Sequence, residues 1–151
     1  MQEGNFRFEW KIFGKDRGVG FLSCSNLHKI DGKRKFDLLE TDNRQALLAR
    51  FESWVGGLIL DSWYHGFNKT QHGGKYTQCF QFRLSDHRFY GFLCHPESDA
   101  RFQICALAIN VIKRQWNVEE KYLKLVADLS RNSNAIKAVN ASFVSEKDGQ
   151  Q

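Results

Sequence analysis

Three stretches in the second half of the chain decide the fold: KYTQCFQFRL (residues 75–84), RFYGFLCH (residues 88–95) and RFQICALAINVI (residues 101–112). Aromatic and β-branched residues are frequent in all three, as is typical of strands. Because only short polar connections separate the three runs, we predict an antiparallel meander. The third run is apolar at nearly every position from Ile104 to Ile112, which predicts a central strand buried on both faces.

Two further strands are expected at the start of the chain. Residues 5–13 alternate between apolar side chains (Phe6, Phe8, Trp10, Ile12) and charged ones (Arg7, Glu9, Lys11), which predicts a half-buried strand. A glycine-containing turn follows, and residues 19–24 predict a second strand paired back on the first. Residues 26–35 carry four cations around an Asp-Gly pair and are expected to form an exposed basic turn.

Two helices are expected. The first begins near Thr41 or Asp42, has apolar residues at helical spacing (Leu47, Phe51, Trp54, Val55, Leu58), and is ended by the glycines at 56 and 57. The second is capped by Asn117, has two glutamates in its first turn and ends near Ser130. Residues 61–74, aromatic, polar and rich in glycine, are expected to form a loop.

The predicted fold class is therefore α+β. An antiparallel sheet, made of the N-terminal strand and the C-terminal three-stranded meander, carries one central and one C-terminal helix. The 151 residues suit one domain, which we place at residues 1–130. Residues 131–151 are small and polar with scattered apolar positions, and we expect a partly disordered C-terminal extension with at most a weak helix or strand.

Composition excludes several function classes. The longest uninterrupted apolar stretch, residues 104–109, is far shorter than the roughly 20 residues of a membrane-spanning helix, and the N-terminus lacks the features of a secretory signal. We expect a cytoplasmic protein with reduced cysteines, no metal and no cofactor, because its four cysteines show no CxxC pair and no phosphate-binding glycine loop is present. The net charge of +5 favours anionic partners such as nucleic acid.

Cations and proton-transfer groups gather around the meander. RNA cleavage without a metal needs cations for the phosphate, a base for the 2′-hydroxyl and an acid for the leaving oxygen. The candidate catalytic residues are Arg83, His87, Tyr90, Lys113 and Arg114, and the candidate RNA-binding residues are Lys75, Arg88 and Arg101. His87 is the candidate for proton transfer because imidazole titrates near neutral pH. The alternative is that these basic residues are simply solvated at strand ends while Tyr90 packs at a sheet edge.

The order FQFRL (residues 80–84), HRFYGFL (residues 87–93) and ICALAINVIKR (residues 104–114), followed by a helix, resembles the RelE/ParE toxin superfamily, in particular its phage-derived and HigB-like branches. The resemblance covers residues 75–129. It implies a RelE-like fold and a toxin that cleaves mRNA on the ribosome and is neutralised by a cognate antitoxin protein. It also implies that Arg83 stabilises charge in the transition state, that Lys113 and Arg114 form the family's basic pair, and that Arg88 and Tyr90 face the cleft.

A second hypothesis comes from a different class of function. The aromatic segment at residues 61–74 contains Trp63, Tyr64 and Phe67, which are residue types that anchor protein interfaces. The chain would then be a non-catalytic phage or mobile-element module that inhibits or regulates a host protein. Core packing is the competing interpretation of the same three side chains.

Overall fold

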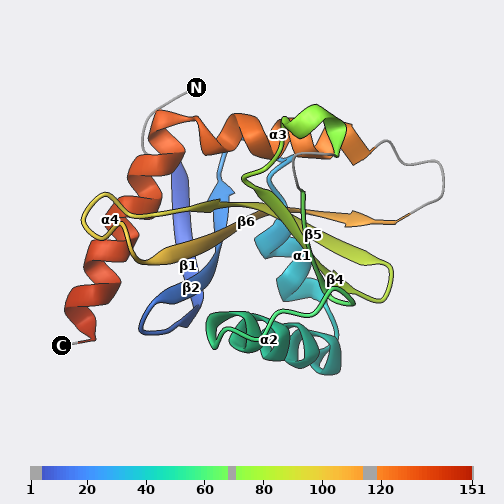
Figure 1. Ribbon diagram of the computed structural model, residues 1–151, viewed down its shortest axis with the longest axis horizontal. Coiled ribbons are helices and arrows are strands. Elements are labelled where there is room, and N and C mark those ends of the chain that lie inside the picture. Colours follow the sequence, from blue (N-terminus) through green and yellow to red (C-terminus); the bar gives the residue numbers. More distant parts are fainter. Residues whose placement is uncertain (1–4, 68–70, 114–118, 151) are drawn as a thin grey trace.

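The computed structural model describes residues 5–67, 71–113 and 119–150. Within these ranges the elements are β1 (Phe6–Phe13), β2 (Arg17–Cys24), α1 (Gly32–Leu38), α2 (Thr41–Val55), β3 (Tyr64–Gly66), the 3-10 helix η1 (His72–Gly74), β4 (Cys79–Leu84), β5 (His87–Cys94), β6 (Gln103–Ile112), α3 (Glu119–Ser130) and α4 (Ser133–Gly149). The strands form one sheet in the order β1-β2-β6-β5-β4-β3 (Figure 1). None of the described helices is long and apolar enough to cross a membrane.

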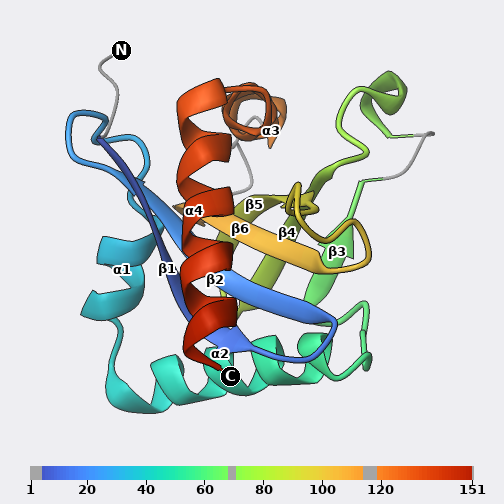
Figure 2. The ribbon, with the colours of Figure 1, turned by 90° about the vertical axis from the view of Figure 1, so that its left-hand side faces the viewer.

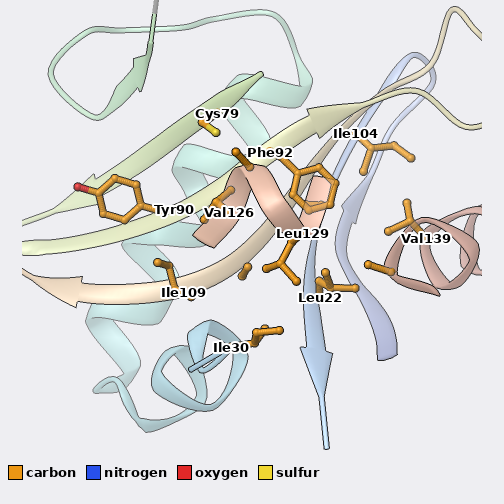
Figure 3. Close-up of a cluster of buried hydrophobic side chains, with 14 of the residues drawn as sticks. Leu22, Ile30, Cys79, Tyr90, Phe92, Ile104, Ile109, Val126, Leu129 and Val139 are labelled. Carbon is orange, nitrogen blue, oxygen red and sulfur yellow. The ribbon is translucent and has the colours of Figure 1, made fainter. Parts of the chain in front are cut away.

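The sheet lies between two layers of helices (Figures 1 and 2). Helices α1 and α2 cover one side, here called the α2 face, and helices α3 and α4 cover the other, called the α3 face. Side chains alternate across each strand, so the neighbours Phe21 and Leu22 are both fully buried but belong to opposite layers. Leu22, Ile104, Val126 and Val139 line the α3 face (Figure 3).

The meander is confirmed, since β4 pairs with β5 and β5 with β6, both antiparallel. The expectation of a wholly antiparallel sheet is wrong, because β2 lies parallel to β6, with Arg17 opposite Gln103 and Phe21 opposite Leu107. A central strand that is buried on both faces is apolar throughout, whether its neighbours run parallel or antiparallel to it. The sequence therefore indicated that β6 is central without indicating the direction of its second partner.

Two helices depart from what the sequence predicts. Helix α1 replaces the expected basic turn: Phe36 points into the core while Lys33 and Lys35 stay partly exposed, and Gly32 packs so closely on β6 that a Cβ there would lie 3.0 Å from the Ala108 carbonyl. Helix α4 forms in the expected C-terminal extension and buries Ala135, Val139 and Phe143. It is fixed to β1 by hydrogen bonds from the Trp10 Nε1 to the Ser142 carbonyl and from the Ser142 hydroxyl to the Phe8 carbonyl.

A bulge in each half of the sheet changes which face a residue occupies. In β1 the register shifts between Trp10 and Ile12, so Trp10 packs on the α3 face and Ile12 on the α2 face, contrary to the expected alternation. Between β5 and β6, Tyr90 pairs with Ile109 and the adjacent Gly91 pairs with Leu107, which leaves Ala108 as an extra residue. Ala108 and Ile109 consequently both join the α3 face.

Candidate functional site

Three of the predicted site residues lie together on the α3 face. Phe82 and Phe89 belong to the core of the α2 face, so their neighbours Arg83 on β4 and Arg88 on β5 extend from the opposite side of the sheet. Arg83 and Arg88 are directly opposite each other in the strand pair, and Tyr90 follows two positions along the same face of β5. The structure thus brings together two of the candidate catalytic residues, Arg83 and Tyr90, and one candidate RNA-binding residue, Arg88.

Glutamates from the start of α3 meet this part of the sheet. The Tyr90 hydroxyl donates to Glu119 Oε2 at 2.9 Å, and the Gln81 amide nitrogen lies 3.5 Å from the same oxygen. His72 of η1 places its Nε2 3.5 Å from Glu119 Oε1 and its Nδ1 3.9 Å from Glu120 Oε1. Each glutamate keeps more than a third of its side chain exposed, so Glu119 is held by three residues and still reaches solvent.

Buried polar atoms without partners mark the centre of this group. Gln81 is 2% exposed, and its Oε1 has no hydrogen-bond partner. The Nε of Arg83 is also buried and unpartnered. In the described part of the chain neither Arg83 nor Arg88 forms an ion pair with a carboxylate. Buried polar groups in native proteins are nearly always hydrogen-bonded. Two unpartnered atoms on the same face of β4 are therefore consistent with a site that a bound group completes.

Two neighbouring side chains have shifted pKa values. His65 on β3 lies opposite Gln81; burial, and next the positive charge of Arg83, lower its pKa, which favours the neutral imidazole. Burial, and next the charge of Glu119, raise the pKa of Tyr90, which keeps its hydroxyl protonated as a donor. We call Gln81, Arg83, Arg88, Tyr90, Glu119, His65 and His72 the polar cluster.

The remaining predicted site residues lie apart from the polar cluster or at its margin. His87 stacks on Phe89, a core residue of the α2 face, so its ring lies on the other side of β5 from Arg88 and Tyr90. Lys113 is exposed beside the β4–β5 turn, where its backbone N–H donates to the Asp86 carbonyl.

The last three predicted cations divide by position. Lys75 is exposed just after η1. Arg101 is exposed beyond the far end of β6, separated from the Arg88 end by roughly 20–25 Å of strand at about 3.3 Å per residue. Arg114 lies outside the described residues, as does Asn117, the expected helix cap.

The aromatic segment is largely internal. Trp63 is 8% exposed and stacks on Phe82, and Phe67 is 2% exposed. Tyr64 belongs to β3, a short strand inside the expected loop, and is partly buried. Its ring stacks on Phe80 of the neighbouring strand β4. The positions of Trp63 and Phe67 match the core-packing interpretation of this segment.

Four members of the polar cluster, His65, His72, Gln81 and Glu119, are not predicted from the sequence, nor is Glu120, which lies beside His72. The two glutamates did carry a signal, but it was explained by the favourable position of acidic residues at a helix start. His65 and His72 lie in the segment for which the sequence predicts a loop. Gln81 lies on the face of β4 that the sequence pattern marks as polar and exposed. This face is buried at Gln81 because α3 packs over β4.

The described residues contain no group of three or more His, Cys, Asp or Glu side chains placed to hold a metal ion. The chemistry available in the polar cluster is that of two arginines, a hydrogen-bonded carboxylate, two imidazoles and a protonated phenol. Such a set can bind an anion and move protons beside it. No family model, curated protein or solved structure matches this chain.

Proposed function

We propose that this chain binds single-stranded RNA at Arg83 and Arg88 and cleaves it as a toxin-like endoribonuclease, using only proton-transfer groups of the polar cluster. One observation carries the proposal. Two adjacent arginines without carboxylate partners in the described residues, one of them with a buried unpartnered Nε, lie next to the hydrogen-bonded pair of Tyr90 and Glu119. Arginine is the side chain best suited to bind phosphate oxygens in a planar, multidentate way.

The proposed reaction is an internal transfer at phosphorus. The 2′-oxygen attacks the adjacent phosphorus as its proton passes to the Glu119 carboxylate. The bond from phosphorus to the 5′-oxygen breaks, and that oxygen takes a proton from the His72 imidazolium. The products are a 2′,3′-cyclic phosphate and a free 5′-hydroxyl.

The two arginines and Tyr90 have supporting roles in this proposal. Arg83 and Arg88 stabilise the negative charge that develops on the non-bridging oxygens. Tyr90, kept protonated by its burial, donates to Glu119 and fixes the carboxylate on the side of the arginines. Cleavage on the ribosome and neutralisation by a cognate antitoxin, both implied by the resemblance to the RelE/ParE superfamily, are part of the same proposal.

Binding and cleavage are tested on a labelled single-stranded RNA, beside the same strand carrying 2′-deoxy sugars. We expect Arg83→Gln to weaken binding about tenfold and to lower the salt dependence, because one phosphate contact is lost. The matched control is Arg34→Gln, the same substitution at an exposed position of α1, which should bind as the parent protein does.

Chemistry is tested separately with Glu119→Gln, which keeps the side-chain shape. We expect unchanged binding and cleavage slower by about a hundredfold or more, and no cleavage of the deoxy strand by any variant. Equal RNA affinity of Arg83→Gln and Arg34→Gln would contradict the assignment of the site. In a bacterial host, induced expression should arrest growth and deplete mRNA, whereas a variant with Arg83, Lys113 and Arg114 all changed to alanine should do neither.

A second candidate function is the non-catalytic binding module that regulates a host protein. One observation favours it: Leu58, Ile59 and Leu60 are consecutive apolar residues that are 57%, 41% and 47% exposed, and they directly precede the aromatic segment. RNA binding decides between the two candidates, since an electrostatic site weakens steeply as salt rises and an apolar protein contact changes little.

A further inference from the structure

A pocket of about 280 Å³ opens between α3, β6 and the segment before α1. Its apolar lining comes from Ile109 and Val111 of β6 and from Leu125 of α3, and Tyr122 adds an aromatic ring. The bulge in β6 creates this floor, because it turns Ile109 to the α3 face beside its strand partner Tyr90 (Figure 3).

The pocket adjoins the polar cluster. The Tyr122 ring stacks on the Tyr90 ring with centroids 6.0 Å apart and an interplanar angle of 26°. Tyr90 in turn donates its hydroxyl to Glu119, one helical turn before Tyr122. Tyr122 therefore lines the pocket and contacts the polar cluster through Tyr90, which places the pocket beside the proposed scissile phosphate.

Two lysines and one aspartate lie at the rim of the pocket. Lys29 and Lys121 are exposed, and in the described ranges neither pairs with a carboxylate. Asp31 accepts the backbone N–H of Asn110 through Oδ1 at 3.1 Å, which fixes its carboxylate beside the pocket. An apolar floor, an aromatic ring, two cations and one acceptor make a combination that suits a nucleobase with its phosphate.

We propose that this pocket holds one nucleobase of single-stranded RNA, next to the scissile phosphate, and that Asp31 selects bases with an exocyclic amino group over uracil. This inference rests on the proposed function of the polar cluster. The base lies on the Ile109 and Val111 floor against Tyr122, while Lys29 and Lys121 contact its phosphate. The carboxylate of Asp31 accepts a hydrogen bond from an amino donor of adenine, cytosine or guanine and repels the carbonyl oxygens that flank the uracil N–H.

The test compares binding of poly-A, poly-C and poly-U oligonucleotides of equal length to the full chain and four variants. Tyr122→Leu keeps an apolar side chain but removes the ring, and should weaken binding of all three strands about tenfold. Asp31→Asn keeps the Oδ1 contact with Asn110 and should abolish the preference for A and C over U. Lys121→Gln should weaken all three strands equally, and Lys124→Gln, on the same helix but not lining the pocket, is the control.

The outcomes separate this inference from the function on which it rests. Suppose that RNA binding is weakened in Arg83→Gln but unchanged in Tyr122→Leu, and that Asp31→Asn keeps the base preference of the parent protein. This result would overturn the pocket assignment and leave the proposed function standing. Equal affinity of the parent protein for the U, A and C strands would also overturn the pocket assignment. If the parent chain binds none of the three strands, both proposals fall together. Thermal unfolding of each variant shows whether a lost affinity reflects a lost fold.

Discussion

Gly91→Ala should strongly destabilise the chain, because this glycine permits the bulge that turns Ile109 toward the candidate site. A Cβ at position 91 would lie 2.2 Å from the Ala106 carbonyl oxygen and 2.8 Å from the Leu107 Cα. An ordinary contact between carbon and a carbonyl oxygen is about 3.3–3.6 Å, so the backbones must separate by roughly 1 Å. Strand β6 has little freedom to retreat, because β2 pairs with its other edge.

The magnitude follows from this geometry. Overpacking a core costs about 1–3 kcal/mol even when flexible side chains can adjust, and here the obstacle is backbone. Stretching one or two ladder hydrogen bonds adds about 1 kcal/mol each. We therefore expect a loss of about 3–5 kcal/mol, a large share of the roughly 5–15 kcal/mol typical of a domain.

Urea unfolding followed by circular dichroism measures this loss. With a slope of about 2 kcal/mol per molar urea, the midpoint should fall by about 1.5–2.5 M. The matched control is Gly66→Ala on the edge strand β3, where the nearest atom to a new Cβ is 4.0 Å away, and its midpoint should move little. A Gly91→Ala midpoint equal to that of Gly66→Ala would refute the account of the bulge.

Three further predictions follow from single contacts or pKa shifts. Folding lowers the pKa of His65, so the unfolded chain binds more protons there. The contribution of His65 to stability is therefore complete above the unfolded pKa of about 6.5 and is lost as the pH falls through the folded pKa. Between pH 7.5 and 5.5 the free energy of unfolding should drop more in the parent than in His65→Gln. Burial raises the pKa of Cys79 and of Cys94 to about 12, so iodoacetamide at pH 8 should label both at least tenfold more slowly in the native chain than in urea, as peptide mass spectrometry measures. Asn132 caps α4 by accepting two backbone N–H groups, so Asn132→Ala should cost about 1 kcal/mol in urea unfolding, whereas an extension independent of the fold would show no change.

The parts of the fold that the sequence predicts are those with local patterns. Strand β1 forms where the alternating pattern lies, although its bulge moves Ile12 to the other face, and α2 begins at Thr41. The meander follows from short polar turns. Helix α1 was hidden because a seven-residue helix with one buried aromatic residue, Phe36, resembles a basic turn in sequence. Helix α4 was hidden because small residues such as Ala135 form an inward face only when a closely packed strand lies beneath them.

The candidate site was predicted in part for the same reason. Arg88 and Tyr90 share a face of β5 because side chains alternate along a strand, which is a local rule, whereas only the pairing of β4 with β5 places Arg83 opposite Arg88. Glu119 meets Tyr90 only because α3 crosses β5, and no pattern within either segment specifies that crossing. His87 is a candidate because of its residue type alone. Its position on the strand, odd-numbered like that of Phe89, puts its ring on the α2 face.

Gln81 offers a test of whether the polar cluster is kept for function at the expense of stability. It is 2% exposed, its Oε1 has no partner, and its amide nitrogen lies 3.5 Å from Glu119, at the limit of a hydrogen bond. An unsatisfied buried polar group costs about 1–3 kcal/mol, whereas methionine has nearly the same shape and nothing to satisfy. Gln81→Met should therefore raise the free energy of unfolding by about 1 kcal/mol.

If the polar cluster binds RNA as proposed, the same variant should bind RNA less tightly, because methionine lacks the oxygen that is left unpartnered in the parent. Gains in stability with loss of activity are the usual result of replacing a strained functional group. The contrasting control is Phe82→Leu, on the other face of β4, which should lower stability and leave RNA affinity unchanged. A Gln81→Met variant that is less stable than the parent and binds RNA equally well would identify Gln81 as a structural residue, and would remove the buried orphan from the argument for the site.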